Sequence, residues 1–425
     1  MYIKQLTNSE FSEFTKTYPL KSIYQTKAYA LVMNQQGFDS LFLGMFDNEK
    51  IVAASLILVR KENGFKYAYA PRGFLINYND LELLNNFTNE IKKYLGSKGI
   101  IAVKLNPLIV KNILDFNNQN IIANKDYNKI YGYLKQLGYY HFGYNNFFEA
   151  LKPRFDAVLR IDKQANVLFK NVRKGFKTKI RNAINCGIKI YKGNIDTIEY
   201  LYEQAKHKYP RDLNYFKDCY NYFSKDNLID YYYTKLDTAV YLKHTQEQFI
   251  KYEQESQKLN NRIMNKPGKN NKKQINKKIN IDKYLEKYRK QLIEATEMLK
   301  EYPNGIVTST ILIVREQNEI TILLDAHEPK YQRFNSKHLL IWQLIQKYSK
   351  DGYKIFNMGG ISNALVDTKY FTGLNEFKLS FGSVAYEYLG DLELITNKRG
   401  YNMYRSCVPI KNLIKSKLIR LNCTP

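Results

Sequence analysis

Hydrophobic side chains recur at helical spacing along two stretches in the middle of the chain. The first stretch repeats every seven residues with a second row three residues later, and the second alternates steps of four and three. The repeated positions are Leu242, Thr245, Phe249, Tyr252, Ser256, Leu259 and Ile263, then Ile281, Leu285, Tyr288, Leu292, Ala295 and Leu299. Between them, residues 265–273 are polar and include Pro267 and Gly268, which end helices. We predict two helices that fold back as an antiparallel coiled-coil arm. An ordinary helical insertion packed on the body is the alternative, because Thr245 and Ser256 are polar.

The pattern on either side of this arm predicts two series of elements in the same order. The first series has helices at 9–17 and 25–36, strands at 41–46, 51–60 and 65–70, a helix at 80–95 and a strand at 100–105. The second has helices at 195–207 and 213–224, strands at 229–236, 305–315 and 319–326, a helix at 336–350 and a strand at 353–358. The second, third and fourth strands begin near 51, 65 and 100 in one series and near 306, 319 and 353 in the other. We therefore predict two copies of one module.

The arm interrupts the second copy where the first copy has the short turn 47–49 between two strands. Hairpin tips tolerate insertions, so an arm kept there is more plausibly a docking element than core. The order of elements resembles the GNAT acyltransferase fold. This resemblance implies an α/β protein with mixed sheets, built from tandem GNAT-like acyltransferase domains with an inserted antiparallel coiled-coil arm. The predicted boundaries are 1–153 for the first domain, 154–240 and 303–395 for the segments of the second, 241–302 for the arm and 396–425 for a C-terminal tail.

Composition narrows the class of partner. The 425 residues have a net charge of +26, which favours a polyanionic partner such as nucleic acid, an anionic membrane surface or a phosphorylated substrate. No apolar run reaches the length of a membrane helix, and the first residues lack the apolar core of a signal peptide. The four cysteines are scattered without a C-x-x-C pair, so a reduced, cytoplasmic protein is favoured over a disulfide or zinc framework.

Two cofactor classes lack their motifs in this chain. A conventional acetyltransferase of the GNAT fold cradles coenzyme A with an R/Q-x-x-G-x-G/A loop, and neither copy has one at the expected junction. The glycine-bearing stretches 71–73 and 357–360 have a different spacing, and the five histidines are dispersed without a metal-binding motif. We therefore expect neither coenzyme A nor a metal.

A basic stretch precedes the second copy. Six basic residues lie on a predicted helix over 171–186 and the residue before it, namely Lys170, Arg173, Lys174, Lys177, Lys179 and Arg181. An apolar stripe runs through the same helix at Val172, Phe176, Ile180 and Ile184. The stretch is either a contact surface for a phosphate backbone or anionic headgroups, or a solvated face on an anchored helix.

A set of short motifs, in order along nearly the whole chain, resembles the Fem peptidyltransferases. The motifs are Tyr-Ala-Tyr-Ala-Pro-Arg-Gly at 67–73, Lys-Leu-Asn-Pro at 104–107, the basic stretch 170–187, Arg-Asp-Leu-Asn-Tyr-Phe at 211–216, and the glycine-containing stretches 352–362, 373–382 and 387–390. The members with a coiled-coil arm, FemA, FemB and MurM, are the most similar group. The resemblance implies an enzyme that moves an amino acid from aminoacyl-tRNA to the stem peptide of a lipid-linked peptidoglycan precursor.

The resemblance also implies roles for particular residues. Lys378, which follows Phe377 in its motif, matches the lysine that stabilises the tetrahedral intermediate, and a surface lysine at a strand edge is the alternative. Arg211 matches an arginine that grips the precursor diphosphate, with Tyr215 one helical turn on, and a surface charge at a helix start is the alternative. The remaining candidate substrate-binding residues are Tyr69, Arg72 and Asn106.

This chain departs from the family pattern at two positions. Asn106 stands where many members have an aspartate, so a carboxylate general base is missing there. Proton transfer must then use another group or the terminal hydroxyl of the tRNA. The lysine that joins the arginine at the diphosphate aligns with Met33, and Lys27 is nearby but out of register.

The predicted protein is a cytoplasmic aminoacyltransferase, peripheral to the inner face of the cytoplasmic membrane, with aminoacyl-tRNA as co-substrate and a lipid II-type precursor as acceptor. Two alternatives stay open. One is a tRNA-dependent transferase with another acceptor, and the other is a non-catalytic module that binds tRNA or membrane. The exposed seams of the arm could also pair with a second copy or a related transferase.

Overall fold

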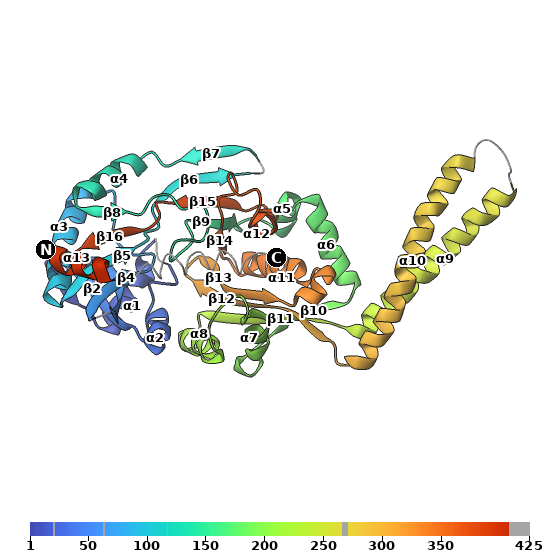
Figure 1. Ribbon diagram of the computed structural model, residues 1–425, viewed down its shortest axis with the longest axis horizontal. Helices are drawn as coiled ribbons and strands as arrows, with labels where there is room; N and C mark the ends of the chain where they lie inside the picture. The colour runs from blue at the N-terminus through green and yellow to red at the C-terminus, as the bar shows by residue number, and fades with distance from the viewer. Residues whose placement is uncertain (20–21, 63, 117, 266–270, 408–425) are drawn as a thin grey trace.

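The computed structural model describes residues 1–19, 22–62, 64–116, 118–265 and 271–407. Figure 1 shows an elongated body built around two sheets, from which a helical hairpin projects at one end. No helix in the described part of the chain is long and apolar enough to cross a membrane.

Among the described residues, seven strands form the first sheet, in the order β1-β2-β3-β4-β5-β16-β8. They are β1 (Tyr2–Gln5), β2 (Asp39–Asp47), β3 (Lys50–Glu62), β4 (Phe65–Ala70), β5 (Ile100–Leu105), β8 (Tyr139–His141) and β16 (Leu392–Ile395). β4 and β5 are parallel, and the other neighbours are antiparallel. The helix α3 (Leu81–Ser97) connects the parallel pair, as a crossover between parallel strands requires.

Nine strands within the described ranges form the second sheet, in the order β10-β11-β12-β13-β14-β9-β15-β6-β7. They are β10 (Ile188–Lys192), β11 (Ile229–Leu236), β12 (Ile306–Glu316), β13 (Glu319–His327), β14 (Ile355–Ile361), β9 (Phe155–Arg160), β15 (Val384–Tyr388), β6 (Val110–Asp115) and β7 (Asn120–Ala123). The parallel pair is β13 and β14, with α11 (Ser336–Lys350) as its crossover. The two sheets thus repeat one topology, which confirms the predicted tandem module.

The copies exchange strands. β9 follows the first copy in the chain but lies in the second sheet, between β14 and β15. β16 follows the second copy but lies in the first sheet, between β5 and β8. β6 and β7 also extend the second sheet, although both lie within the predicted first domain, 1–153. A division of the chain at residue 153 therefore does not separate the sheets.

The remaining helices cover the sheets and the join between the copies. They are α1 (Asn8–Thr17), α2 (Lys27–Gln35), α4 (Tyr127–Gln136), α5 (Ala165–Asn171), α6 (Lys174–Asn185), α7 (Glu199–Ala205), α8 (Leu213–Lys225), α12 (Thr372–Leu379) and α13 (Lys398–Cys407), with short 3₁₀ turns η1 (Ile195–Thr197) and η2 (Pro329–Phe334). α1 begins at a capping box, in which the Thr7 hydroxyl accepts from the Glu10 amide (3.2 Å) and the Thr7 amide donates to the Glu10 carboxylate (2.7 Å).

One hydrophobic core spans the two copies. Phe11 and Val32, from α1 and α2, belong to the same buried cluster as Phe216 and Phe223 of α8 and Leu312 of β12. Each of these side chains is 0% exposed. Together with the exchanged strands, this shared core makes the two copies one packed body, so residues from both copies are held in fixed positions at the join.

The hairpin consists of α9 (Thr238–Asn265) and α10 (Asn271–Glu301), inserted between the paired strands β11 and β12. The two helices are antiparallel, because Tyr252 stacks on Tyr288 (5.3 Å between ring centroids) while Ser256 bonds the earlier Asp282. That bond, 2.5 Å from the Ser256 hydroxyl to the Asp282 carboxylate, satisfies a polar position of the predicted seam. Residues 266–270 of the predicted turn lie outside the described residues. The flanking positions 265 and 271–273, also assigned to that turn, are helical.

Within the described residues, the hairpin packs on the body at its base. Tyr241 is buried there with its ring edge-on to Phe334, at 4.9 Å between centroids. Where α10 returns to β12, Gly305 has a φ of +82°, and a Cβ there would lie 2.6 Å from the Leu236 carbonyl oxygen, so glycine is required. The rest of the hairpin projects, which is not the arrangement of an insertion packed along the body. A coiled-coil supercoil stays a prediction.

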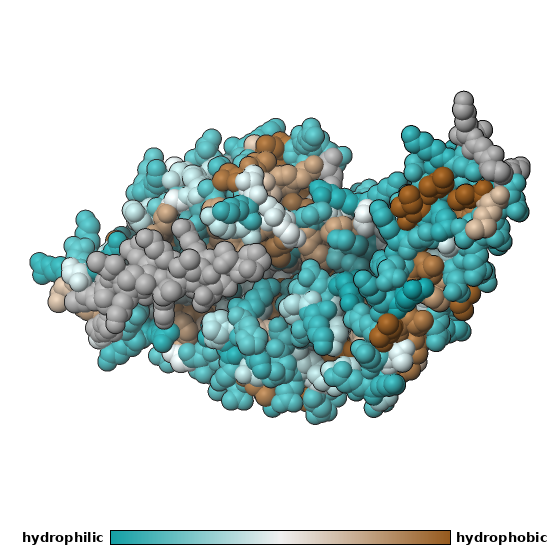
Figure 2. Space-filling view, turned by 45° about the vertical axis from the view of Figure 1, so that its right-hand side comes forward, coloured by the Kyte–Doolittle hydropathy of each residue, from teal (hydrophilic) through white to brown (hydrophobic). Residues whose placement is uncertain are grey.

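Apolar side chains lie among the hydrophilic ones on the projecting part of the hairpin (Figure 2). The large exposed apolar residues of the two helices are Val240, Ile250, Met264, Ile275, Ile279, Tyr284 and Ile293. Pairing of the hairpin with another chain stays a prediction.

Candidate active site

Lys378 is a buried residue of α12, not a surface lysine at a strand edge. Its side chain is 8% exposed, and its Nζ donates a hydrogen bond of 2.8 Å to the carbonyl oxygen of Gly360 in β14. Burial lowers the pKa of Lys378 to about 8. The charges of Lys337 and Lys208 act in the same direction, while Asp325 opposes them. Lys378 is therefore mainly a cation at neutral pH, and its proton is easier to lose than that of an exposed lysine.

A small cavity adjoins the lysine. Its volume is about 10 Å³, enough for roughly one water molecule. Its lining residues are Ile322, Asp325, Lys337, Ile341, Met358, Phe377 and Lys378. Lys337 is ion-paired with Asp325, so the second ammonium beside Lys378 is neutralised and the charge of Lys378 is not. A negative charge that develops beside Lys378 would thus face a cation in largely apolar surroundings, where the attraction is strong.

A segment of the first copy covers the strand that Lys378 bonds to. A Cβ at Gly360 would lie 2.2 Å from the Cγ of Pro153, so glycine permits this close contact. In the same segment, Asn146 bonds Asn363 (2.9 Å between the amides), and the ring of Phe148 packs edge-on to Phe371 at 4.8 Å. The surroundings of Lys378 are therefore built from both copies.

Phe377 connects Lys378 to the basic stretch. Its ring lies 5.0 Å from that of His338, which in turn lies 4.7 Å from Phe176 of α6. Neither ring nitrogen of His338 has a hydrogen-bond partner among the described residues. Burial lowers the pKa of His338 to about 3, with Lys179 and Lys337 acting in the same direction, so the imidazole is neutral. Phe377 is thus a packing residue between α6, α11 and α12.

The predicted basic helix over 171–186 is two helices, and the single-helix prediction was wrong. α5 and α6 are separated at Val172 and Arg173, whose ψ angles of 132° and 142° are extended. Val172, Phe176 and Ile180 are buried as predicted, but Ile184 is 54% exposed and Ala183 is buried instead. Val172 is buried at the break between the two helices, so the hydrophobic pattern continues across it.

The basic side chains of this stretch surround a solvent-facing surface. Lys177 is partly buried, and the other four candidate anion-binding residues, Lys170, Arg173, Lys174 and Arg181, are exposed. Arg173 lies 4.0 Å from Glu376, and its amide donates to the carbonyl oxygen of Ser380 (2.9 Å), which ties the start of α6 to the end of α12.

Asn106 bridges a buried network at the ends of β4 and β5. Its side-chain oxygen accepts from the Arg72 amide (2.8 Å), and its amide nitrogen donates to the hydroxyl of Tyr69 (3.0 Å) and to the Asp391 carboxylate (3.3 Å). Asp391 is also ion-paired with Lys104 at 2.8 Å. The fold therefore places a carboxylate, that of Asp391, beside Asn106. Because Asp391 comes from the far end of the chain, sequence reasoning missed it.

The guanidinium of Arg72 is occupied inside the protein. It donates to the Asp156 carboxylate (3.1 Å) and to the Pro153 carbonyl oxygen (2.9 Å), and it lies 4.7 Å from the ring centroid of Tyr388. Arg72 and Asp156 are 4% and 6% exposed. Asp156 is paired in register with Gly360, the residue whose carbonyl oxygen accepts from Lys378, so the ion pair lies next to the surroundings of Lys378.

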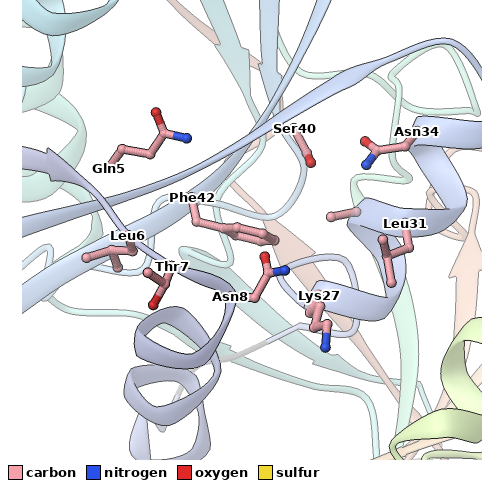
Figure 3. Close-up of a pocket in the computed structure, with 10 residues that line it drawn as sticks. Gln5, Leu6, Thr7, Asn8, Lys27, Leu31, Asn34, Ser40 and Phe42 are labelled. Carbon is pink, nitrogen blue, oxygen red and sulfur yellow. The ribbon is translucent and has the colours of Figure 1, made fainter.

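Arg211 and Tyr215 lie where α8 meets α2. Arg211 is exposed, donates to the Gln36 side chain (3.0 Å) and lies 5.1 Å from the ring of Tyr215. Asp212 caps α8 by accepting from the Tyr215 amide at 3.0 Å. Met33 is 8% exposed in the core of the join. Lys27 lines a separate groove of about 570 Å³ between α1, α2 and β2 (Figure 3).

The predicted residues thus fall into separate groups. Lys378 is linked to the network of Tyr69, Arg72 and Asn106 through Gly360, which is paired with Asp156, whereas none of the candidates lines the groove of Figure 3. The basic stretch contacts α12, the helix of Lys378, through the packing of Phe176 on Phe377 and through Arg173. Sequence reasoning missed Asp325 and Lys337, although both lie within predicted elements. In the described part of the chain, no group of three or more His, Cys, Asp or Glu is placed to hold a metal.

The similarity to known proteins extends over nearly the whole chain. A family model described as the FemAB family matches residues 6–407. The aminoacyltransferase FemA of Staphylococcus epidermidis is 26% identical over 436 residues, covering 97% of this chain and 100% of the relative. The lipid II:glycine glycyltransferase of Staphylococcus haemolyticus is 23% identical, covering 98% of each chain. The crystal structure of FemX superposes with a TM-score of 0.71 at 20% identity, covering 95% of this chain and 99% of FemX.

Proposed function

Because this chain belongs to the FemAB family, we propose that it is an aminoacyltransferase that adds an amino acid from aminoacyl-tRNA to the stem peptide of a lipid-linked peptidoglycan precursor. The names of its relatives support this reaction class, since they are an aminoacyltransferase and a lipid II glycyltransferase. The observation on which the proposal rests is the buried ammonium of Lys378, neutralised by no ion pair among the described residues.

The reaction needs a cation beside the carbonyl oxygen of the donor ester. The free amine of the stem peptide attacks the ester carbonyl of the donor, the C–N bond forms, and the carbonyl oxygen becomes an oxyanion. Lys378 uses one N–H on Gly360, which fixes its direction and leaves the others for that oxyanion. The ester C–O bond then breaks, the terminal hydroxyl of the tRNA leaves, and the proton lost by the amine goes to that hydroxyl oxygen directly or through another group.

Three features support aminoacyl-tRNA as the donor and the inner face of the cytoplasmic membrane as the location. The motifs for coenzyme A are missing, and the net charge of +26 suits a polyanionic tRNA together with an anionic membrane surface. A lipid-linked acceptor places the enzyme at the inner face of the cytoplasmic membrane. The basic surface of α5 and α6 is the proposed contact for the tRNA backbone, because it is exposed and connected through Phe176 and Phe377 to α12.

A single transfer experiment tests this function. Purified protein is incubated with a lipid-linked muropeptide precursor and total tRNA charged with a labelled amino-acid mixture. We expect a mass increase of one amino-acid residue on the precursor, and loss of that increase when the tRNA is uncharged. Transfer only to a different acceptor would replace the proposed acceptor, and tRNA binding without any transfer would indicate a binding module.

Charge reversal on α6 should weaken use of the tRNA. With Lys174→Glu and Arg181→Glu combined, we expect KM for aminoacyl-tRNA to rise about tenfold and the salt dependence of binding to flatten, because phosphate contacts are lost. The measurement is the transfer rate against tRNA concentration at two ionic strengths. Lys125→Glu with Lys129→Glu, two exposed lysines on or near α4, is the matched control. An equal loss of transfer in the α6 variant and the control would mean that the basic stretch does not bind the tRNA.

A further inference from the structure

The positive charge of the hairpin is concentrated at its outer end. We call residues 256–265 and 271–281 the outer half, and residues 238–255 and 282–301 the inner half. The inner half has seven basic and eight acidic residues, so its charge is nearly balanced. The outer half has six basic residues and no acidic one, and its basic residues are Lys258, Arg262, Lys272, Lys273, Lys277 and Lys278. The excess positive charge of the described hairpin therefore lies at the end far from the body (Figure 1).

Four of these six cations make no ion pair within the described ranges. Lys277 pairs with Glu255 at 3.2 Å and Lys278 pairs with Asp282 at 2.6 Å, both across the border with the inner half. The four remaining cations, Lys258, Arg262, Lys272 and Lys273, are exposed. The outer half thus presents cations to solvent that attract a partner with negative charge.

Large apolar side chains lie among these cations. Met264, Ile275 and Ile279 are 71%, 43% and 48% exposed, and Ile275 and Ile279 are one helical turn apart on α10. Figure 2 shows apolar side chains close to the outer end of the hairpin. The contact between the two helices uses other residues, since Leu259 and Ile281 are buried there. The three exposed side chains are therefore available to a partner.

A membrane surface with anionic lipids matches both features of the outer half. Its phosphates attract lysine and arginine, and the region of its headgroups takes up aliphatic side chains. A nucleic acid would contact the cations only, because the described outer half has no aromatic ring for stacking on bases. The outer half of a second copy carries the same positive charge, so contact between two outer halves is opposed by repulsion.

We propose that the outer half of the hairpin binds an anionic membrane surface, with Met264, Ile275 and Ile279 inserted among the headgroups and the four exposed cations at the lipid phosphates. The inference rests on the proposed function, because a lipid-linked acceptor is confined to the membrane. The base of the hairpin packs on the body through Tyr241 and Phe334. Binding at the outer end therefore keeps the body near the surface that carries the acceptor.

Binding of the full-length protein to vesicles tests this surface without any transfer reaction. Vesicles of phosphatidylglycerol and phosphatidylcholine are compared with vesicles of phosphatidylcholine alone by sedimentation. We expect the protein to prefer the anionic vesicles. Two outer variants, Ile275→Gln with Ile279→Gln and Lys272→Gln with Lys273→Gln, should each weaken this binding about 10- to 100-fold.

The inner half supplies a matched control for each outer variant. Ile250 and Ile293 are 51% and 60% exposed, so Ile250→Gln with Ile293→Gln removes similar apolar surface. Lys243 and Lys300 are exposed, so Lys243→Gln with Lys300→Gln removes the same charge. We expect both inner variants to bind the anionic vesicles as the unaltered protein does.

A tryptophan probe measures insertion directly. Trp342 is the one tryptophan of the chain, and it is 7% exposed in the body. For Ile275→Trp we expect fluorescence that is quenched when the anionic vesicles contain brominated phosphatidylcholine. The fluorescence of Trp342 in the unaltered protein should not be quenched.

Each outcome decides the proposal. Weaker vesicle binding in both outer variants, with both inner variants unchanged, supports it. An equal loss in the outer and inner variants, or no quenching of the probe at position 275, overturns it. Outer variants that bind vesicles normally but lose binding of labelled tRNA also overturn it, and they would make the outer half a contact for nucleic acid.

The proposed function is tested separately with the same variants. With the lipid-linked acceptor in anionic vesicles, the outer variants should raise KM for the acceptor, and with the acceptor in detergent micelles KM should stay unchanged. If the unaltered protein transfers to the acceptor in neither form, the proposed function fails. Vesicle binding and quenching then still decide whether the outer half binds the membrane.

Discussion

Replacing Lys378 with methionine should lower kcat for transfer by about 10²- to 10³-fold, the usual loss when one oxyanion donor is removed. Methionine is of similar length and apolar, and Lys378 is 8% exposed beside a cavity of about 10 Å³, so the fold should be retained. Because the lost contact forms only with the oxyanion, KM for the acceptor should stay within about twofold. The measurements are single-turnover transfer and binding of labelled precursor.

The pH dependence of transfer is a second test of the role of Lys378. Only the ammonium form of Lys378 stabilises an oxyanion, and its pKa is lowered to about 8. Transfer by the unaltered protein should therefore fall as pH rises through about 8. Lys378→Arg should be slower at neutral pH because its larger head crowds the small cavity, but it should show no fall at that pH, since a guanidinium stays charged. The charged groups that also affect this pKa are Asp325, Lys337, Lys208 and Asp156.

Lys369→Met is the matched control for the methionine variant. Lys369 is exposed, in the loop before α12, and its amide donates to the Asp367 carboxylate (3.1 Å), a contact that the substitution leaves in place. We expect its kcat to be unchanged. If Lys378→Met folds, binds the precursor and transfers at the rate of Lys369→Met, the oxyanion is stabilised by another group.

The sequence predicted those parts of the site that depend on local order. Lys378 and Phe377 lie in a motif with a fixed place in a predicted module, and α12 presents both. Asp325 could have been found as well, since it comes near the end of the predicted strand 319–326, directly after two leucines. Its ion pair with Lys337 could not, because that pairing depends on how α11 packs on the sheet.

Long-range pairing explains what local order could not predict. β9 and β16 each lie in the sheet of the other copy, and nothing in their own residues selects the partner strand. The contact of Asp391 with Asn106 follows from that exchange, because β16 places the far end of the chain beside β5.

Replacing Arg72 with methionine should lower the apparent free energy of unfolding by about 3–5 kcal/mol, because Asp156 would remain buried without its partner. The same residue was a candidate for substrate binding, and the two roles predict different results. A substrate contact alone would raise KM and leave the urea midpoint unchanged. An internal ion pair would move the midpoint first. The measurement is urea unfolding of the free protein, followed by KM for the acceptor at a temperature where each variant is folded.

Two further variants distinguish loss of the pair from loss of packing. Combining Arg72→Met with Asp156→Asn should cost less than the sum of the single changes, because no unpaired charge remains. The cost that persists in the double variant belongs to the Pro153 carbonyl and the Tyr388 ring, which also contact the guanidinium. Arg160→Met is the control, since Arg160 pairs with Asp162 at 2.5 Å on the surface and should contribute little to the free energy of unfolding. If the loss of unfolding free energy in the double variant equals the sum of the losses in the single variants, Arg72 and Asp156 are not coupled. Arg72 would then be free to act on the substrate, and the buried join would depend on packing alone.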